Sequence, residues 1–225
     1  MTICNKLEEL IRAKLAHVLK LRGTKKSKPD GSYVSEGDLL MEKVVFDYIT
    51  SLGDDYYLIS EEKDNSDFSF DQYRFAVTID PIDGTENFVS GLKEWGVGIS
   101  IYEKGRHVES MIALPELNIY LKTGDDFPKY ESRIYGLSSS LSKEDLIQLD
   151  EGYEYRIIGC CMYNMYNVLT GSYAVFENPN GVWSWDILPG LNLALENNCK
   201  VTLENQKYNG EFLYPNKRYR FKIEN

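Results

Sequence analysis

The sequence is poor in the residues that build many metal and nucleophile sites. Its 225 residues include only two histidines, His17 and His107, ninety positions apart. A zinc site made of clustered histidines and a histidine-dependent nucleophilic triad are therefore both disfavoured. If the protein binds metal ions, we expect oxygen ligands.

The sequence also lacks the cysteine spacing of a metal or redox site and the long apolar run of a membrane span. No C-x-x-C pair occurs among the four cysteines, and adjacent cysteines rarely bond to each other, so free thiols in a reducing compartment are the simpler interpretation. The first twenty-one residues carry repeated charges and match neither a signal peptide nor a membrane span. These features predict a cytoplasmic protein without a membrane partner.

A basic surplus is missing as well. The chain has 35 acidic residues against 25 lysines and arginines, a formal net charge of −10, which argues against nucleic acid as a partner. The hydrophobic share of 43% and charged share of 27% are those of a globular protein rather than a disordered one.

Hydrophobic periodicity predicts helices and strands in a mixed order. Residues 5–22 have helical spacing, and a second amphipathic helix starts near Asp38, which we expect to be its N-cap. Strands are predicted at residues 56–60 and 74–79, and an antiparallel meander over residues 95–122.

The last third alternates strand and helix, and a capping-box pattern at Ser142 predicts a short helix. The expected fold class is therefore α+β combined with α/β. We expect residues 1–130 to form an α+β half with the acidic site and residues 131–225 an α/β half with Asp186, packed as one unit.

The strongest motif is the run DPIDGTENF, which begins at Asp80 where a buried strand pattern ends. Asp80 and Asp83 flank a turn and can converge on hard cations, which prefer oxygen ligands, with the Ile82 carbonyl as a further ligand. Gly84 and Thr85 open a helical turn whose N–H groups can hold phosphate. The alternative is an Asx turn that merely closes the strand.

This run resembles the DPIDGT signature of the inositol monophosphatase superfamily, the magnesium-dependent, lithium-sensitive phosphatases. Upstream, residues 59–62 (ISEE) are similar to the family's strand-ending Gly-Glu-Glu, and residues 28–38 to its Lys-x-Asp-x-Ser-Pro-Val-Thr-x-x-Asp loop. Trp185-Asp186 resembles the family's Trp-Asp at a helix N-terminus. The resemblance runs from about residue 28 to residue 210.

The resemblance implies a layered α–β–α–β–α fold and a site for two to three magnesium ions. The implied metal ligands are Glu61, Asp80, the Ile82 carbonyl, Asp83 and Asp186. The implied catalytic residues are Asp38 and Thr85, which position and deprotonate a water, together with Glu61, and the N–H groups of Gly84 and Thr85 hold the phosphate.

Three substrate contacts are implied. Glu177 matches a family glutamate that binds substrate hydroxyls, and Lys28 stands at its place in the loop motif. Cys160 lies where the family often has serine, which weakens a hydroxyl-type contact; small apolar packing is its alternative role.

The implied activity is magnesium-dependent hydrolysis of a small phosphate ester, with inositol, another polyol or a sugar as the alcohol. Histidinol phosphate and 3′-phosphoadenosine 5′-phosphate are the alternative substrates, and a homodimer is left open. A catalytically silent scaffold is the alternative of a different class, and the presence of every implied carboxylate counts against it.

Overall fold

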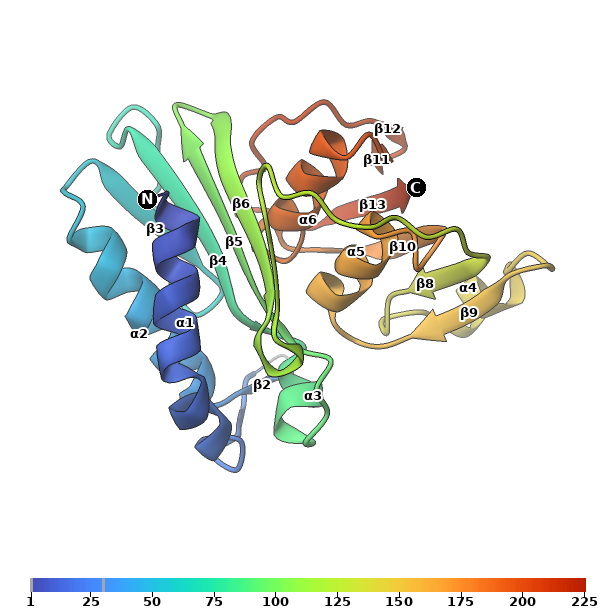
Figure 1. The fold of residues 1–225 in the computed structure, drawn as a ribbon, viewed down its shortest axis with the longest axis horizontal. Helices are drawn as coiled ribbons and strands as arrows, with labels where there is room; N and C mark the ends of the chain where they lie inside the picture. The colour runs from blue at the N-terminus through green and yellow to red at the C-terminus, as the bar shows by residue number, and fades with distance from the viewer. Residues whose placement is uncertain (1, 30) are drawn as a thin grey trace.

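The computed structural model describes residues 2–29 and 31–225, which form alternating layers of helices and sheets. Figure 1 shows helices α1 (Ile3–Lys20) and α2 (Glu36–Thr50) on one side of a first sheet, and helices α5 (Cys161–Leu169) and α6 (Ser184–Glu196) between that sheet and a second one. The short helix α4 (Lys143–Ile147) lies beyond the second sheet. The expected α–β–α–β–α layering is confirmed.

The first sheet has five strands in the order β3 (Tyr56–Ser60), β4 (Phe75–Asp83), β5 (Gly96–Glu103), β6 (Arg106–Leu114) and β7 (Ile119–Lys122). Strands β3 and β4 are parallel, and the other neighbours are antiparallel. Strand β4 is almost entirely buried because helices cover both faces of the sheet. A single-turn 3₁₀ helix, Pro115–Leu117, joins β6 to β7.

The second sheet has six strands in the order β12 (Gln206–Lys207), β11 (Lys200–Leu203), β13 (Tyr219–Glu224), β10 (Val175–Val182), β8 (Ile134–Leu137) and β9 (Glu154–Ile157). Strands β8, β9 and β10 run parallel, so their carboxyl ends meet at one edge. A hairpin of β1 (Lys26–Ser27) and β2 (Tyr33–Val34) precedes α2, and α3 (Thr85–Val89) follows β4.

Helices α5 and α6 join the two sheets through one hydrophobic core. Gly98 of β5 and Gly190 of α6 make this close approach possible, because a Cβ at Gly190 would lie 1.8 Å from Met165 Sδ and one at Gly98 would lie 2.2 Å from Met162 Cε. The same contact holds the first turns of α5 and α6 over the end of β4.

Three local predictions differ from the structure. Ser35, not Asp38, is the N-cap of α2; Asp38 is the third helical residue and completes a capping box with Ser35. Strand β4 continues to Asp83, past its expected end, because it still pairs with β5 after a bulge. Strands β8 and β13 were not predicted, although Tyr219, Phe221 and Ile223 of β13 alternate with polar residues in the pattern of a strand.

Among the described residues, no helix combines the length and the apolar character needed to cross a membrane.

Candidate active site

Acidic residues from three separated segments meet at one end of the first sheet. Ser60 pairs with Ile79 in the parallel strands β3 and β4, so Glu61 and Asp80 follow at adjacent carboxyl ends. Asp83 comes three residues later, and Asp186 lies in the first turn of α6. All four line one cleft of about 310 Å³, a size typical of small-molecule sites.

Asp80 is the most deeply buried of these carboxylates. Its side chain is 2% exposed, and its Oδ1 atom has no hydrogen-bond partner among the described residues. Burial raises the pKa of Asp80 well above its ordinary value, and the charges of Glu61, Asp83 and Asp186 raise it further. Burial, followed by Glu61 and Asp83, likewise raises the pKa of Asp186. Among the described residues, no lysine or arginine forms an ion pair with Asp80, Asp83 or Asp186, and the one ion pair at this cluster is that of Lys28 with Glu61.

One oxygen of Asp83 and one of Asp186 are held by the protein. Cys160 Sγ donates to Asp83 Oδ2 at 2.9 Å, and the Met162 N–H donates to the same oxygen. Burial raises the pKa of Asp83 to about 6, although both of these hydrogen bonds lower it. The Trp183 N–H donates to Asp186 Oδ2 at 2.9 Å. These bonds orient the carboxylates and leave their other oxygens for a further partner.

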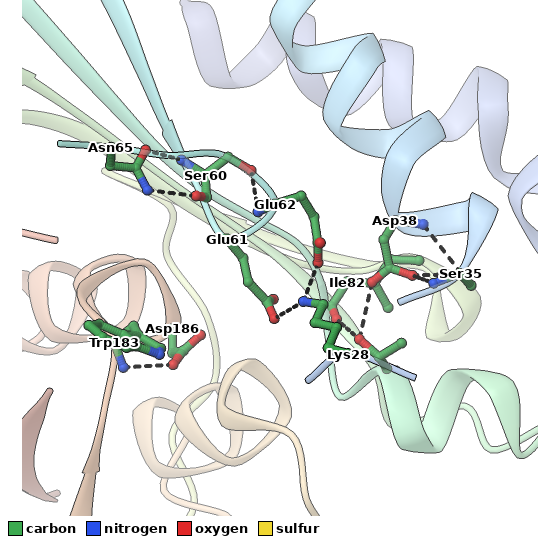
Figure 2. Close-up of polar contacts among 11 residues, drawn as sticks. Lys28, Ser35, Asp38, Ser60, Glu61, Glu62, Asn65, Ile82, Trp183 and Asp186 are labelled. Atoms are coloured by element: carbon green, nitrogen blue, oxygen red, sulfur yellow. Dashed lines mark hydrogen bonds and ion pairs between the residues drawn. The ribbon is translucent and has the colours of Figure 1, made fainter. Parts of the chain in front are cut away.

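Lys28 contributes the positive charge nearest to Glu61. Its Nζ donates to Glu61 Oε1 at 2.7 Å and to Glu62 Oε1 at 2.6 Å, as Figure 2 shows. Burial lowers the pKa of Lys28, but the charges of Glu61 and Glu62 outweigh burial and hold the pKa above its ordinary value. The predicted substrate residue Lys28 therefore contacts a predicted metal ligand and is not among the residues that line the cleft.

The residues of the cluster fit a hard divalent cation by their chemistry. The side-chain atoms that could ligate a metal are all carboxylate oxygens, and the Ile82 carbonyl is beside them. Asp80 Oδ1 is buried and has no hydrogen-bond partner among the residues that the structure describes. As the side chains stand, no group of three or more His, Cys, Asp or Glu residues within the described part of the chain is arranged to hold a metal ion. Glu61 is turned to Lys28, so a cation at Glu61 would share or replace that ion pair.

Asp38 and Thr85 meet at the edge of this cluster. Asp38 Oδ2 accepts from the Ser35 N–H at 2.8 Å and the Ser35 hydroxyl at 2.6 Å. Thr85 Oγ1 lies 3.1 Å from Asp38 Oδ1 and 3.0 Å from the Ile82 carbonyl, two acceptors for one hydroxyl proton. Burial raises the pKa of Asp38, and the hydrogen bonds from Ser35 and Thr85 oppose that rise.

Gly84 has a left-handed backbone with φ of 80°, which favours glycine, and it precedes the helical turn that begins at Thr85. A Cβ at Gly84 would lie 3.0 Å from Cys160 Cβ. The predicted phosphate residues Gly84 and Thr85 both line the cleft, next to Asp83.

Two predicted substrate residues have other contacts. Cys160 lines the cleft, but its thiol donates to Asp83. Glu177 does not line the cleft; it accepts a hydrogen bond from the Tyr135 hydroxyl. The neighbouring residue Asn178 lines the cleft instead, because successive side chains of β10 point to opposite faces of the sheet.

Sequence reasoning missed the wall of the cleft that the second half of the chain supplies. Its polar members are Ser138, Ser139, Ser140, Asn164, Asn178 and Arg218. They belong to different elements, and no motif or spacing marks them.

A family model described as the inositol monophosphatase family matches residues 1–127, more than half of the chain. The chain belongs to the inositol monophosphatase family. The region that matches ends before the second sheet, so the model covers Glu61, Asp80 and Asp83 but not Asp186.

Curated relatives of this family member match it over part of their length. An inositol-1-monophosphatase of Mesorhizobium japonicum is 31% identical over 91 residues, which are 40% of this chain and 34% of the relative. A 3′(2′),5′-bisphosphate nucleotidase of Haemophilus influenzae is 28% identical over 110 residues, 48% of this chain and 40% of the relative.

Solved structures resemble the whole fold. A staphylococcal inositol monophosphatase crystallised with its products has a TM-score of 0.79 at 20% identity, over 99% of this chain and 88% of that one. At this identity the likeness establishes the mixed α/β fold of the family.

Proposed function

We propose that this protein is a magnesium-dependent phosphomonoesterase that hydrolyses a small phosphate ester. The observation that carries the proposal is Asp80, a buried carboxylate beside Glu61, Asp83 and Asp186 whose Oδ1 atom has no hydrogen-bond partner in the described part of the chain. Repulsion among these carboxylates is relieved when a divalent cation binds, and the all-oxygen donor set favours magnesium.

In the proposed site Glu61, Asp80, the Ile82 carbonyl, Asp83 and Asp186 would hold two to three magnesium ions. Bound magnesium would supply positive charge for the phosphate and lower the pKa of a water. The bonds from Cys160 and the Met162 N–H keep Asp83 in place, and the Trp183 N–H does the same for Asp186.

The chain's own residues then position the reacting groups. Thr85 would orient the attacking water, and Asp38 would accept the proton through the Thr85 hydroxyl, to which it is hydrogen-bonded at 3.1 Å. The N–H groups of Gly84 and Thr85 would bind phosphate oxygens beside Asp83. Each of these roles uses residues that line or border the same cleft.

The leading substrates are inositol, polyol or sugar phosphates, and the name of the Mesorhizobium relative, an inositol-1-monophosphatase, supports the first of these. The nucleotidase relative favours a second candidate, a 3′(2′),5′-bisphosphate, and histidinol phosphate belongs in the same substrate panel. The cleft volume of about 310 Å³ is at the lower end of the range typical of small-molecule sites, which supports a small alcohol.

The test is release of inorganic phosphate from this panel with magnesium and then with excess chelator. We expect chelation to abolish release and Asp83→Asn to lower it about a hundredfold or more, the scale of losing one charge-stabilising group. Asp71→Asn, an exposed acid away from the cleft, is the matched control. Activity that survives chelation would refute the metal mechanism. No release from any ester, together with no magnesium binding by calorimetry, would support the scaffold alternative.

A further inference from the structure

The wall of the cleft that the second half of the chain supplies has its own polar side chains. Ser138 follows β8, and its N–H donates to the Glu177 carbonyl of β10 at 3.1 Å. Val182, at the end of β10, pairs with Tyr219, so the preceding residue Arg218 stands at the rim of the cleft. This wall therefore consists of residues of α5 and β10, the segment that follows β8, and the residue before β13.

Two buried amides of this wall have atoms without a hydrogen-bond partner among the described residues. Asn164 of α5 is 0% exposed, and within the described chain neither its Oδ1 nor its Nδ2 has a partner. Asn178 of β10 is also 0% exposed; its Oδ1 accepts from the Asn180 N–H at 3.1 Å, but no described residue is a partner for its Nδ2. Both line the cleft. Because unpaired buried polar atoms destabilise a fold, their presence at a cleft indicates a ligand that completes them.

Arg218 is the only basic residue among the described residues that line the cleft. Its side chain is exposed, and none of the described residues forms an ion pair or a hydrogen bond with it, although five acidic residues line the same cleft. A guanidinium group binds carboxylate and phosphate oxygens in a bidentate manner. The cleft thus combines a cluster of carboxylates with a cation that has no partner in the described part of the chain.

We propose that this wall binds the alcohol part of the substrate and selects esters whose alcohol carries a second anionic group. Arg218 pairs with that anion, which is a carboxylate or a second phosphate. The amides of Asn164 and Asn178 hydrogen-bond the part of the alcohol between the anion and the scissile phosphate. The inference rests on the proposed phosphatase function and narrows its substrate class.

The test compares esters that differ only in the second anion. Glycerol 3-phosphate and 3-phosphoglycerate differ by a carboxylate, and adenosine 3′-phosphate and adenosine 3′,5′-bisphosphate differ by a phosphate. In at least one pair, we expect the ester with the second anion to have a higher kcat/KM than the ester without it. The pair that shows this difference identifies the anion as a carboxylate or a phosphate. No preference in either pair would overturn the proposal.

For each pair of esters, the ratio compares kcat/KM of the ester with the second anion to kcat/KM of the ester without it. The Arg218→Gln variant should reduce this ratio about tenfold or more, the scale of a charge-assisted hydrogen bond. Lys217→Gln is the matched control, because Lys217 is also exposed and is adjacent in sequence but does not line the cleft. It should keep the wild-type ratio. An unchanged ratio in Arg218→Gln, or an equal drop in Lys217→Gln, would overturn the role of Arg218.

Asn164→Leu separates ligand binding from a structural role. Replacing an unpaired buried amide with an apolar side chain should leave the melting temperature unchanged or higher, while KM for the preferred ester rises. A lower melting temperature with unchanged KM would show that Asn164 is structural and would overturn its part in the proposal.

Calorimetric binding of the same four esters in the presence of magnesium distinguishes this inference from the proposed function. Anion-selective binding that depends on Arg218, without any hydrolysis, would support the subsite and refute the phosphatase. Hydrolysis without a preference for a second anion would support the phosphatase and refute the subsite.

Discussion

The substitution Asp38→Asn tests whether one buried carboxylate is both a helix cap and a proton acceptor. Asp38 is fully buried, with Oδ2 bonded to the Ser35 N–H and hydroxyl and Oδ1 within 3.1 Å of Thr85 Oγ1. In the variant the amide oxygen can accept both bonds from Ser35, while the amide NH₂ faces the Thr85 hydroxyl. Thr85 must then direct its proton to the Ile82 carbonyl, 3.0 Å away.

The two effects of this substitution differ in size. Every hydrogen bond can be kept and one buried charge is removed, so we expect the free energy of unfolding to change by no more than about 1 kcal/mol. Loss of the base should slow phosphate release by about 10²- to 10⁴-fold, or roughly 3–5 kcal/mol in the activation barrier.

The matched control is Ser35→Ala, which removes the N-cap hydroxyl of α2 but keeps the Asp38–Thr85 contact. It should cost about 0.5–2 kcal/mol of stability, a fall of a few degrees in melting temperature, with a much smaller loss of activity. The assay is kcat for phosphate release alongside thermal unfolding. If folded Asp38→Asn keeps more than about a tenth of wild-type kcat, Asp38 is not the base.

Three further outcomes are expected. In the presence of chelator, the protein should lose stability as the pH rises from about 4 through 6. Burial raises the pKa of Asp83 to about 6, so in this range the folded state binds more protons than the unfolded state. Saturating magnesium should oppose this loss, and melting temperatures that do not change with pH would contradict it. Gly190→Ala should cost about 1–3 kcal/mol by overpacking, since its Cβ would lie 1.8 Å from Met165 Sδ, and an unchanged melting temperature would disprove that close packing. Millimolar lithium should inhibit phosphate release, as the family resemblance implies, and undiminished release would indicate an altered metal site.

The sequence alone determined the family, the layered fold and the residues of the acidic cluster. The run from Asp80 to Thr85 is local, since a buried strand followed by a tight turn places its groups within a few residues of one another. The capping box at Ser142 and the meander of β5, β6 and β7 were readable for the same reason. Local geometry depends on nearby residues, so a single sequence is enough to predict it.

Only the tertiary structure decided how distant side chains combine. Glu177 accepts a hydrogen bond from the Tyr135 hydroxyl and does not line the cleft, because the packing of β10 decides which of its two faces meets the cleft. Lys28 pairs with Glu61, thirty-three residues away, which no spacing could reveal. Asn164, Asn178 and Arg218 line one cleft only because α5, β10 and β13 pack together, and contacts between separate elements depend on that packing rather than on local sequence.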